Sequence, residues 1–199
     1  FKHQKLGLKS MNIKSIHTLP ESMKEFLLLV LIALLTLGCS SILEKNSKEA
    51  EFIKTNLLLI KKRMAQGDYS NSLSSLRNML KDHPENPDIL NLAGVSYLSL
   101  KSNKIAAKYF KRATEQRDDV GFQLNYSSAL IQLKEYQKAR DTLLEIKGFD
   151  EYKYFERIMH NLALTYEREG RFKRALFYYN KAIKINPSYY LSTLQIARI

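Results

Sequence analysis

The chain contains 199 residues, with 32 Lys and Arg against 20 Asp and Glu, which gives a formal net charge of +12. Its apolar content of 45% is enough for a packed core, and its seven glycines and four prolines suit long helices. A single cysteine excludes an internal disulfide and a cysteine-based zinc cluster. The positive charge is compatible with an anionic membrane surface, nucleic acid or an acidic protein as partner, or with a basic surface that is only solvated.

The N-terminal part contains an apolar segment that ends just before the cysteine. Residues 26–37 are twelve residues, of which eleven are apolar, and Lys24 supplies a short basic region before them. This length fits the apolar region of a signal peptide and falls short of the about 20 residues that a membrane-spanning helix needs. Phe1 is not an initiator, and Met11 and Met23 are both available as starts, which leaves open that the residues before Met23 are a mis-assigned start.

Gly38 and Cys39 follow the apolar segment directly. This arrangement resembles the signal of bacterial lipoproteins, in which the peptidase cuts before a cysteine that follows a small residue and receives a diacylglycerol. Thr36 stands where that family usually has leucine. The resemblance implies a signal peptide over residues 1–38, a lipidated tether over residues 39–52 and lipid attachment at Cys39.

The same resemblance implies a place in the bacterial cell envelope, where the lipid-anchored chain faces the periplasm or the cell surface. Ser40 follows the cysteine, and the absence of aspartate there favours the outer membrane over the inner one in lipoproteins of enteric type. Two other interpretations of Cys39 stay open. One is a free cysteine buried at the end of a core helix, and the other is an uncleaved single-pass anchor.

Residues 159–187 show the clearest periodicity of the chain. Apolar residues recur at i, i+3, i+4 and i+7 in two successive stretches, which predicts two amphipathic helices. Gly170 separates the stretches, and Pro187 ends the second because proline cannot continue a helix. This pair resembles a tetratricopeptide repeat (TPR), since it carries residues that are typical of that repeat: Leu162, Tyr166, Gly170, Phe172, Ala175, Tyr179, Ala182 and Pro187.

Earlier copies of the same pattern precede this pair. The small residues at equivalent places are Ser72, Ala106, Ala139 and Ala175, which are 34, 33 and 36 residues apart. Because TPRs repeat at about 34 residues, we expect an all-α solenoid of about four helical hairpins over residues 53–189. Residues 190–199 carry one more apolar stripe and are expected to form a C-terminal helix that caps the last repeat.

No set of residues in the sequence indicates catalysis. The four histidines are far apart, and the sequence has no glycine-rich phosphate loop and no His or Cys pair at metal-binding spacing. The prediction is a protein that is not an enzyme and that uses no metal or cofactor.

The resemblance to TPR proteins implies a binding groove. In that family the first helix of each repeat lines a concave surface that holds protein or peptide ligands. The corresponding residues are mainly apolar in the middle of the stack, which indicates a partner with hydrophobic anchors, although the same side chains could simply pack neighbouring first helices together. The predicted groove residues are Lys54, Leu57, Lys61, Asn91, Val95, Leu98, Leu124, Ile131, Arg157, His160 and Leu164.

These observations predict a membrane-anchored scaffold for protein–protein interaction, with a use in envelope or pilus-type assembly, where similar small TPR lipoproteins occur. The alternative is a protein that binds anionic surfaces or nucleic acid through its positive charge. Nucleic acid is the less suitable partner, since an envelope lipoprotein meets little of it.

Overall fold

The computed structural model describes residues 20–146 and 154–199, without the side chains of residues 30–43 and of a few positions before them. Within these residues the chain forms nine α-helices and no strand, which confirms the predicted all-α class. The chain divides into two compact units, Phe1–Lys54 and Thr55–Ile199. No helix of the described part is long and apolar enough to cross a membrane.

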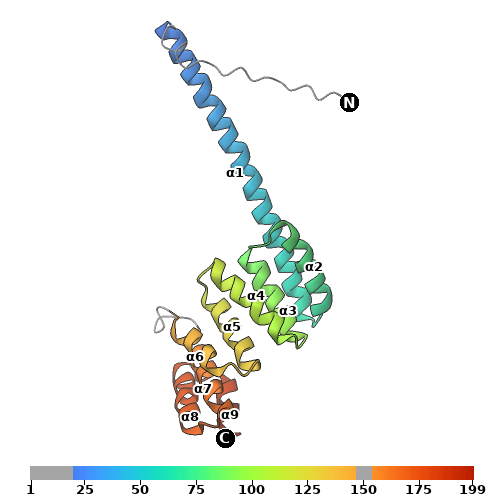
Figure 1. The fold of residues 1–199 in the computed structure, drawn as a ribbon, viewed down its shortest axis with the longest axis vertical. Helices are drawn as coiled ribbons and strands as arrows, with labels where there is room; N and C mark the ends of the chain where they lie inside the picture. The colour runs from blue at the N-terminus through green and yellow to red at the C-terminus, as the bar shows by residue number, and fades with distance from the viewer. Residues whose placement is uncertain (1–19, 147–153) are drawn as a thin grey trace. The chain divides into compact units, whose positions relative to one another are not determined.

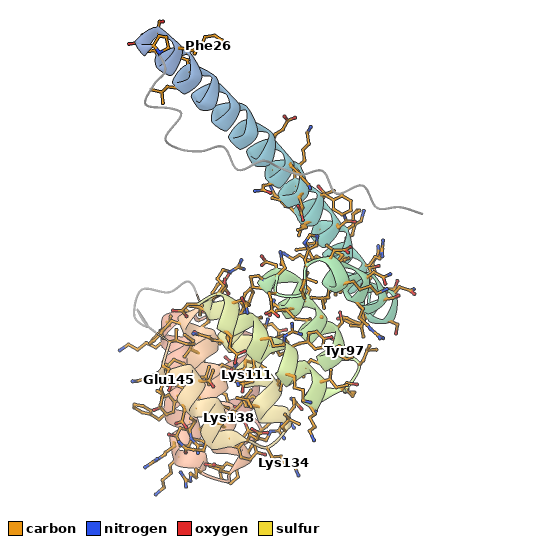
Figure 2. All side chains as sticks on the ribbon, turned by 45° about the horizontal axis from the view of Figure 1, so that its top comes forward. Phe26, Tyr97, Lys111, Lys134, Lys138 and Glu145 are labelled. Atoms are coloured by element: carbon orange, nitrogen blue, oxygen red, sulfur yellow. The ribbon has the colours of Figure 1, made fainter. Side chains whose placement is uncertain are left out.

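The first unit contains most of α1 (Glu21–Ala65), whose last turns, from Thr55 onward, belong to the second unit. The stretch interpreted as a tether, residues 39–52, is therefore helical. Many of its residues have a high helix propensity, and ion pairs one turn apart add to this, since Lys48 Nζ lies 2.6 Å from Glu44 Oε1. Apolar side chains near the start of α1, such as Phe26, are exposed (Figure 2).

The second unit is a series of helical hairpins that follow one another in chain order (Figure 1). Each hairpin consists of a first helix and a second helix, and the end of α1 is the first helix of the first hairpin. The other helices are α2 (Tyr69–Asp82), α3 (Pro87–Ser99), α4 (Asn103–Gln116), α5 (Val120–Gln132), α6 (Tyr136–Leu144), α7 (Phe155–Arg168), α8 (Phe172–Ile185) and α9 (Tyr190–Ile196).

All four hairpins are closed by turns of one kind. Gly67, Lys101, Lys134 and Gly170 each lie two residues after the end of a first helix, and their φ angles are 82°, 63°, 64° and 73°. Glycine adopts this left-handed conformation freely, whereas lysine is strained in it by about 1 kcal/mol. The second and third hairpins therefore keep the turn without glycine, because the packing of the helices on both sides imposes its conformation.

Small residues bring the two helices of a hairpin close together. The four positions predicted to be equivalent, Ser72, Ala106, Ala139 and Ala175, are all fully buried. Gly94 of α3 faces α4 so closely that a Cβ atom added to it would lie 2.6 Å from the ring of Phe110. The spacing of small residues along the sequence thus marks the places where helices meet.

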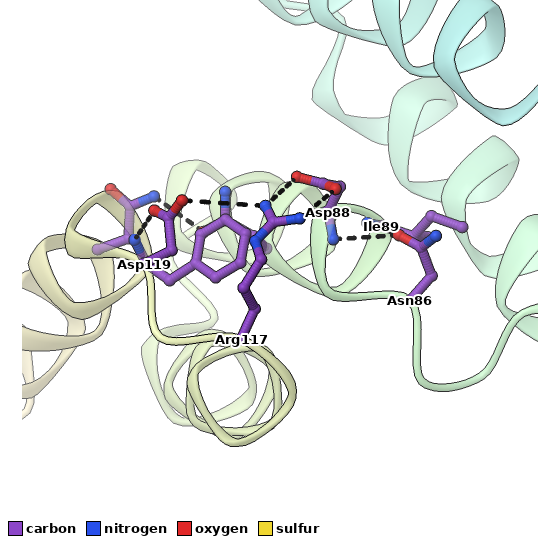
Figure 3. Close-up of polar contacts among 8 residues, drawn as sticks. Asn86, Asp88, Ile89, Arg117 and Asp119 are labelled. Carbon is purple, nitrogen blue, oxygen red and sulfur yellow. Dashed lines mark hydrogen bonds and ion pairs between the residues drawn. The ribbon is translucent and has the colours of Figure 1, made fainter. Parts of the chain in front are cut away.

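Neighbouring hairpins are joined by contacts between their helices. The first helices α3, α5 and α7 contact one another in succession, and each second helix contacts the first helix of the next hairpin. Arg117, just after α4, donates hydrogen bonds of 2.6 and 2.9 Å to Asp88 at the start of α3 (Figure 3). Its guanidinium carbon also lies 4.7 Å from the ring centre of Phe122 in α5. One side chain therefore links three successive helices.

Candidate functional site

Three asparagines connect the first helices of the second, third and fourth hairpins. Asn125 Nδ2 in α5 donates a hydrogen bond of 2.9 Å to Asn91 Oδ1 in α3. Asn161 Nδ2 in α7 lies 3.3 Å from the hydroxyl oxygens of both Ser127 and Ser128 in α5. We call Asn91, Asn125 and Asn161 the asparagine row.

The amides of the asparagine row keep unused hydrogen-bonding capacity. An asparagine side chain has two N–H donors and an oxygen that can accept two hydrogen bonds. In the described part of the chain, no partner is found for Asn91 Nδ2, Asn125 Oδ1 or Asn161 Oδ1. All three side chains are half-buried and not enclosed. They can therefore still exchange hydrogen bonds with a molecule that lies along the first helices.

Half-buried apolar side chains accompany the asparagine row. Asn91, Val95 and Leu98 are spaced i, i+4 and i+7, so they share one face of α3, and Leu164 lies one turn after Asn161 on α7. The apolar members pack at the edge of the hydrophobic cluster around Phe110 and keep part of their surface open. We call these residues, together with Ser128, which contacts Asn161, the groove face: Asn91, Val95, Leu98, Asn125, Ser128, Asn161 and Leu164.

Four of the predicted groove residues lie in the core. Leu57, Leu124, Ile131 and His160 have exposed fractions of only 7%, 1%, 7% and 6%. Leu124, for example, belongs to the buried cluster that also contains Ile158 of α7. These side chains pack helices together and present little surface to a ligand.

One groove position is not equally exposed in the three hairpins, although Val95, Ser128 and Leu164, one turn later, are equivalent and all half-buried. When the second helices are aligned, Leu124 and His160 correspond to Asn91, yet both point into the core. The residue that follows each of them, Asn125 or Asn161, joins the asparagine row instead. Leu124 packs against residues of α6 and α7, a tertiary contact that the repeat spacing does not reveal. The available signal was the recurrence of asparagine 34 and 36 residues apart within first helices.

His160 connects α7 to the C-terminal helix. Its Nδ1 atom and the Ser192 hydroxyl of α9 form a hydrogen bond of 2.9 Å. The rings of Tyr179 and Tyr189 enclose it, with their centres 5.4 and 5.3 Å from the imidazole. Burial lowers the pKa of His160 to about 4, so the ring is neutral at pH 7. This histidine therefore contributes to the attachment of α9.

The charged groove predictions have different surroundings. Lys61 is exposed, and Arg157 is half-buried with its guanidinium carbon 5.4 Å from the ring centre of Tyr154. Lys54 belongs to the first unit, so its place relative to the groove face is not determined. The side chain of Cys39 and residues 1–19 of the predicted signal peptide lie outside the described residues. Within those residues, no three His, Cys, Asp or Glu side chains gather as a metal site.

The fold is shared with solved structures of other proteins. PilF of Pseudomonas aeruginosa matches with a TM-score of 0.66 at 21% identity, over 73% of this chain and 66% of that chain. PilW, described as a widely conserved type IV pilus biogenesis factor, matches with a TM-score of 0.67 at 20% identity, over 73% and 67% of the two chains. YrrB, described as a TPR protein with an unusual peptide-binding site, matches with a TM-score of 0.60 at 20% identity, over 68% and 69%. At such low identity these similarities show the fold alone.

Sequence families give a consistent result. No curated protein matches the chain. Two family models described as tetratricopeptide repeat match it, one over residues 57–120 and 102–153 and the other over residues 157–189. These segments together make up more than half of the chain. The chain therefore belongs to the tetratricopeptide repeat family, as its repeat pattern predicts.

Proposed function

We propose that the chain is a non-catalytic scaffold that holds an extended segment of a partner protein along the groove face. The observation that carries this proposal is the asparagine row, which brings amides with unused capacity from three successive repeats together. Amides can bond to backbone N–H and C=O groups whatever the sequence of the peptide. Val95, Leu98 and Leu164 would receive its apolar side chains.

A library of short random peptides displayed on phage tests the groove. We expect the selected peptides to carry apolar residues and to bind the Asn91→Ala/Asn125→Ala variant about tenfold more weakly, because two hydrogen bonds are lost. The matched control is Asn78→Ala/Asn180→Ala, which removes exposed asparagines from the second helices α2 and α8. Equal weakening in both variants, or no selected peptide at all, contradicts the proposed site.

Cys39 is proposed as the acylated N-terminus of the mature protein, anchored in a bacterial envelope with the outer membrane favoured. The proposal is supported by the apolar segment that ends just before Gly38 and by the exposure of its first side chains. Phe26, Leu28 and Leu29 are 65%, 57% and 64% exposed, so they do not pack in a protein core. Incorporation of a clickable palmitate into wild type but not into Cys39→Ala is expected. An intact chain that begins before Met23 and has an unmodified thiol would overturn it.

Envelope or pilus-type assembly is the setting that we propose for this scaffold. PilF and PilW share its fold, and PilW is described as a pilus biogenesis factor. The proposal rests on this shared architecture together with the lipoprotein-like N-terminus. A deletion strain should lose surface pili, and wild type but not Asn91→Ala/Asn125→Ala should restore them. Normal pili in the deletion strain would exclude a role in pilus assembly, while the peptide library would still test the groove.

A further inference from the structure

The outward side of α8 has a composition unlike that of the groove face. Ala175, Tyr179 and Ala182 form the buried side of this helix. The opposite side carries Lys173, Phe177, Lys181 and Lys184, spaced i, i+4, i+8 and i+11, and all four are exposed. We call these four residues the outer stripe.

The lysines of the outer stripe have no acidic partner among the described residues. α8 contains four basic residues and no acidic one. Two lysines on other second helices have such partners, since Lys111 Nζ lies 3.1 Å from Glu115 and Lys138 Nζ lies 3.4 Å from Glu135 (Figure 2 labels both lysines). The first helices α3 and α5 contain no Lys or Arg. Because α8 has no acidic residue, its positive charge is not compensated within the helix.

An exposed aromatic ring, that of Phe177, lies among the lysines of the outer stripe. Phe177 is 55% exposed, and the Nζ atom of Lys181 lies 4.7 Å from its ring centre. Phe172 and Ile185, at the two ends of the same helix, are 50% and 43% exposed. Large apolar side chains flanked by lysines on one helix are typical of a surface that meets both acyl chains and negatively charged headgroups.

We propose that the outer stripe of α8 docks on the surface of an anionic lipid bilayer. Phe177 would enter the boundary between headgroups and acyl chains, while the lysine stems extend so that their ammonium groups reach the lipid phosphates. A bilayer is favoured over nucleic acid because the exposed aliphatic side chain of Ile185 can enter acyl chains but cannot stack on bases. This site needs neither the groove face nor the acyl group on Cys39.

Binding of the full chain to lipid vesicles tests the proposal. The apolar segment before Cys39 can itself bind lipid of any charge. We therefore compare the affinity for vesicles with about a third phosphatidylglycerol with the affinity for pure phosphatidylcholine vesicles, and we call the ratio of the two affinities the gain. Lys173→Glu/Lys181→Glu should reduce this gain at least roughly 25-fold, since each lysine near such a surface contributes about a factor of five and each glutamate adds repulsion. The gain should also fall when salt is raised from about 0.1 M to about 0.5 M.

A matched control separates a local site from overall charge. Lys104→Glu/Lys108→Glu makes the same charge change with exposed lysines of α4. If both double variants lose the gain equally, net charge alone causes the binding and the outer stripe is not a site. If the α8 variant binds anionic vesicles like wild type, the proposal fails outright. Far-UV circular dichroism of each variant should match wild type, because the substituted side chains are exposed.

The chain contains no tryptophan, so a single one can report on insertion. Phe177→Trp should show a blue-shifted emission on anionic vesicles and none on phosphatidylcholine vesicles, because only docking moves the ring out of water. Ile105→Trp, at a 43% exposed position of α4, should not shift on either. A shift with single-stranded oligonucleotide but not with anionic vesicles would overturn the proposal in favour of nucleic acid.

Discussion

Arg140 of α6 and Glu169, in the turn between α7 and α8, form an ion pair in which Nη2 donates to Oε1 at 2.9 Å and Nη1 lies 2.9 Å from Oε2. The Arg140 side chain is 7% exposed, and its guanidinium carbon lies 5.0 Å from the ring centre of Tyr166. The pair therefore joins the third hairpin to the turn of the fourth, with a buried guanidinium and a carboxylate whose side chain is 22% exposed.

Removal of one partner of this pair should be costly. Glu169→Ala leaves the Arg140 charge buried, so we expect the free energy of unfolding to fall by about 3 kcal/mol. Glu115→Ala breaks an exposed pair with Lys111 and should cost less than about 1 kcal/mol. Urea denaturation measures both values. Equal costs would mean that burial adds nothing to the Arg140–Glu169 pair.

The turns of the second and third hairpins should be improved by glycine. Lys134 has a φ angle of 64°, and Lys134→Gly removes its strain, so we expect a gain of about 0.5–1 kcal/mol in unfolding free energy. Gly170→Ala should have the opposite effect by about 1 kcal/mol. Nothing lies within 4 Å of a Cβ atom at Gly170, so the loss of stability in Gly170→Ala would come from backbone strain alone. A loss of stability in Lys134→Gly would contradict this account of the turns.

Gly94 should not tolerate a side chain. The Cβ atom of Gly94→Ala would meet the Phe110 ring at 2.6 Å, and such overpacking costs about 1–3 kcal/mol. In a Phe110→Leu background the same change should cost much less, because the ring is gone. Thermal denaturation of the two single variants and the double variant measures this coupling. Additive effects would show that the two residues do not constrain each other.

Stability should decrease in mild acid because of His160. Its pKa is about 4 in the folded chain and 6.5 as an ordinary histidine, so between these values only the unfolded chain binds the proton. The stability that the neutral His160 side chain contributes is complete above pH 6.5 and is lost as the pH falls toward 4, at about 1 kcal/mol per pH unit.

His160→Asn provides the comparison for the pH experiment, because its side chain is polar and does not titrate. Urea denaturation at about pH 7.5 and about pH 5 should show a smaller loss for His160→Asn than for wild type. The same slope in both proteins would mean that other groups cause the acid sensitivity. A fluorescent probe on α9 should also report its release before the rest of the chain unfolds.

Sequence patterns predict the hairpins well because their cause is local. Ala106, Ala139 and Ala175 recur where helices touch, and any larger side chain there would separate them. The sequence predicts the turns less well, because Lys101 and Lys134 adopt the left-handed conformation that usually requires glycine. Their strain of about 1 kcal/mol is small beside the packing of two helices.

The burial of individual groove candidates is harder to predict, for a physical reason. Successive residues lie about 100° apart around a helix, so Leu124 is buried while Asn125 is half-buried. Which of the two is buried depends on contacts with α6 and α7, which no local pattern records. The attachment of His160 to Ser192 likewise depends on where α9 packs.

The scarcity of charge on α3 and α5 affects how fast a partner of the proposed groove can bind. Asp88 is the one charged residue of α3 and α5, and Arg117 already neutralises it. For a partner without net charge, association with such a face proceeds at about 10⁵–10⁶ M⁻¹s⁻¹, far below the rates of electrostatically steered complexes. An acidic partner would associate faster, because the whole chain carries a formal net charge of +12. A neutral partner at low concentration would therefore bind slowly unless it were held close to the chain, for example on the same membrane.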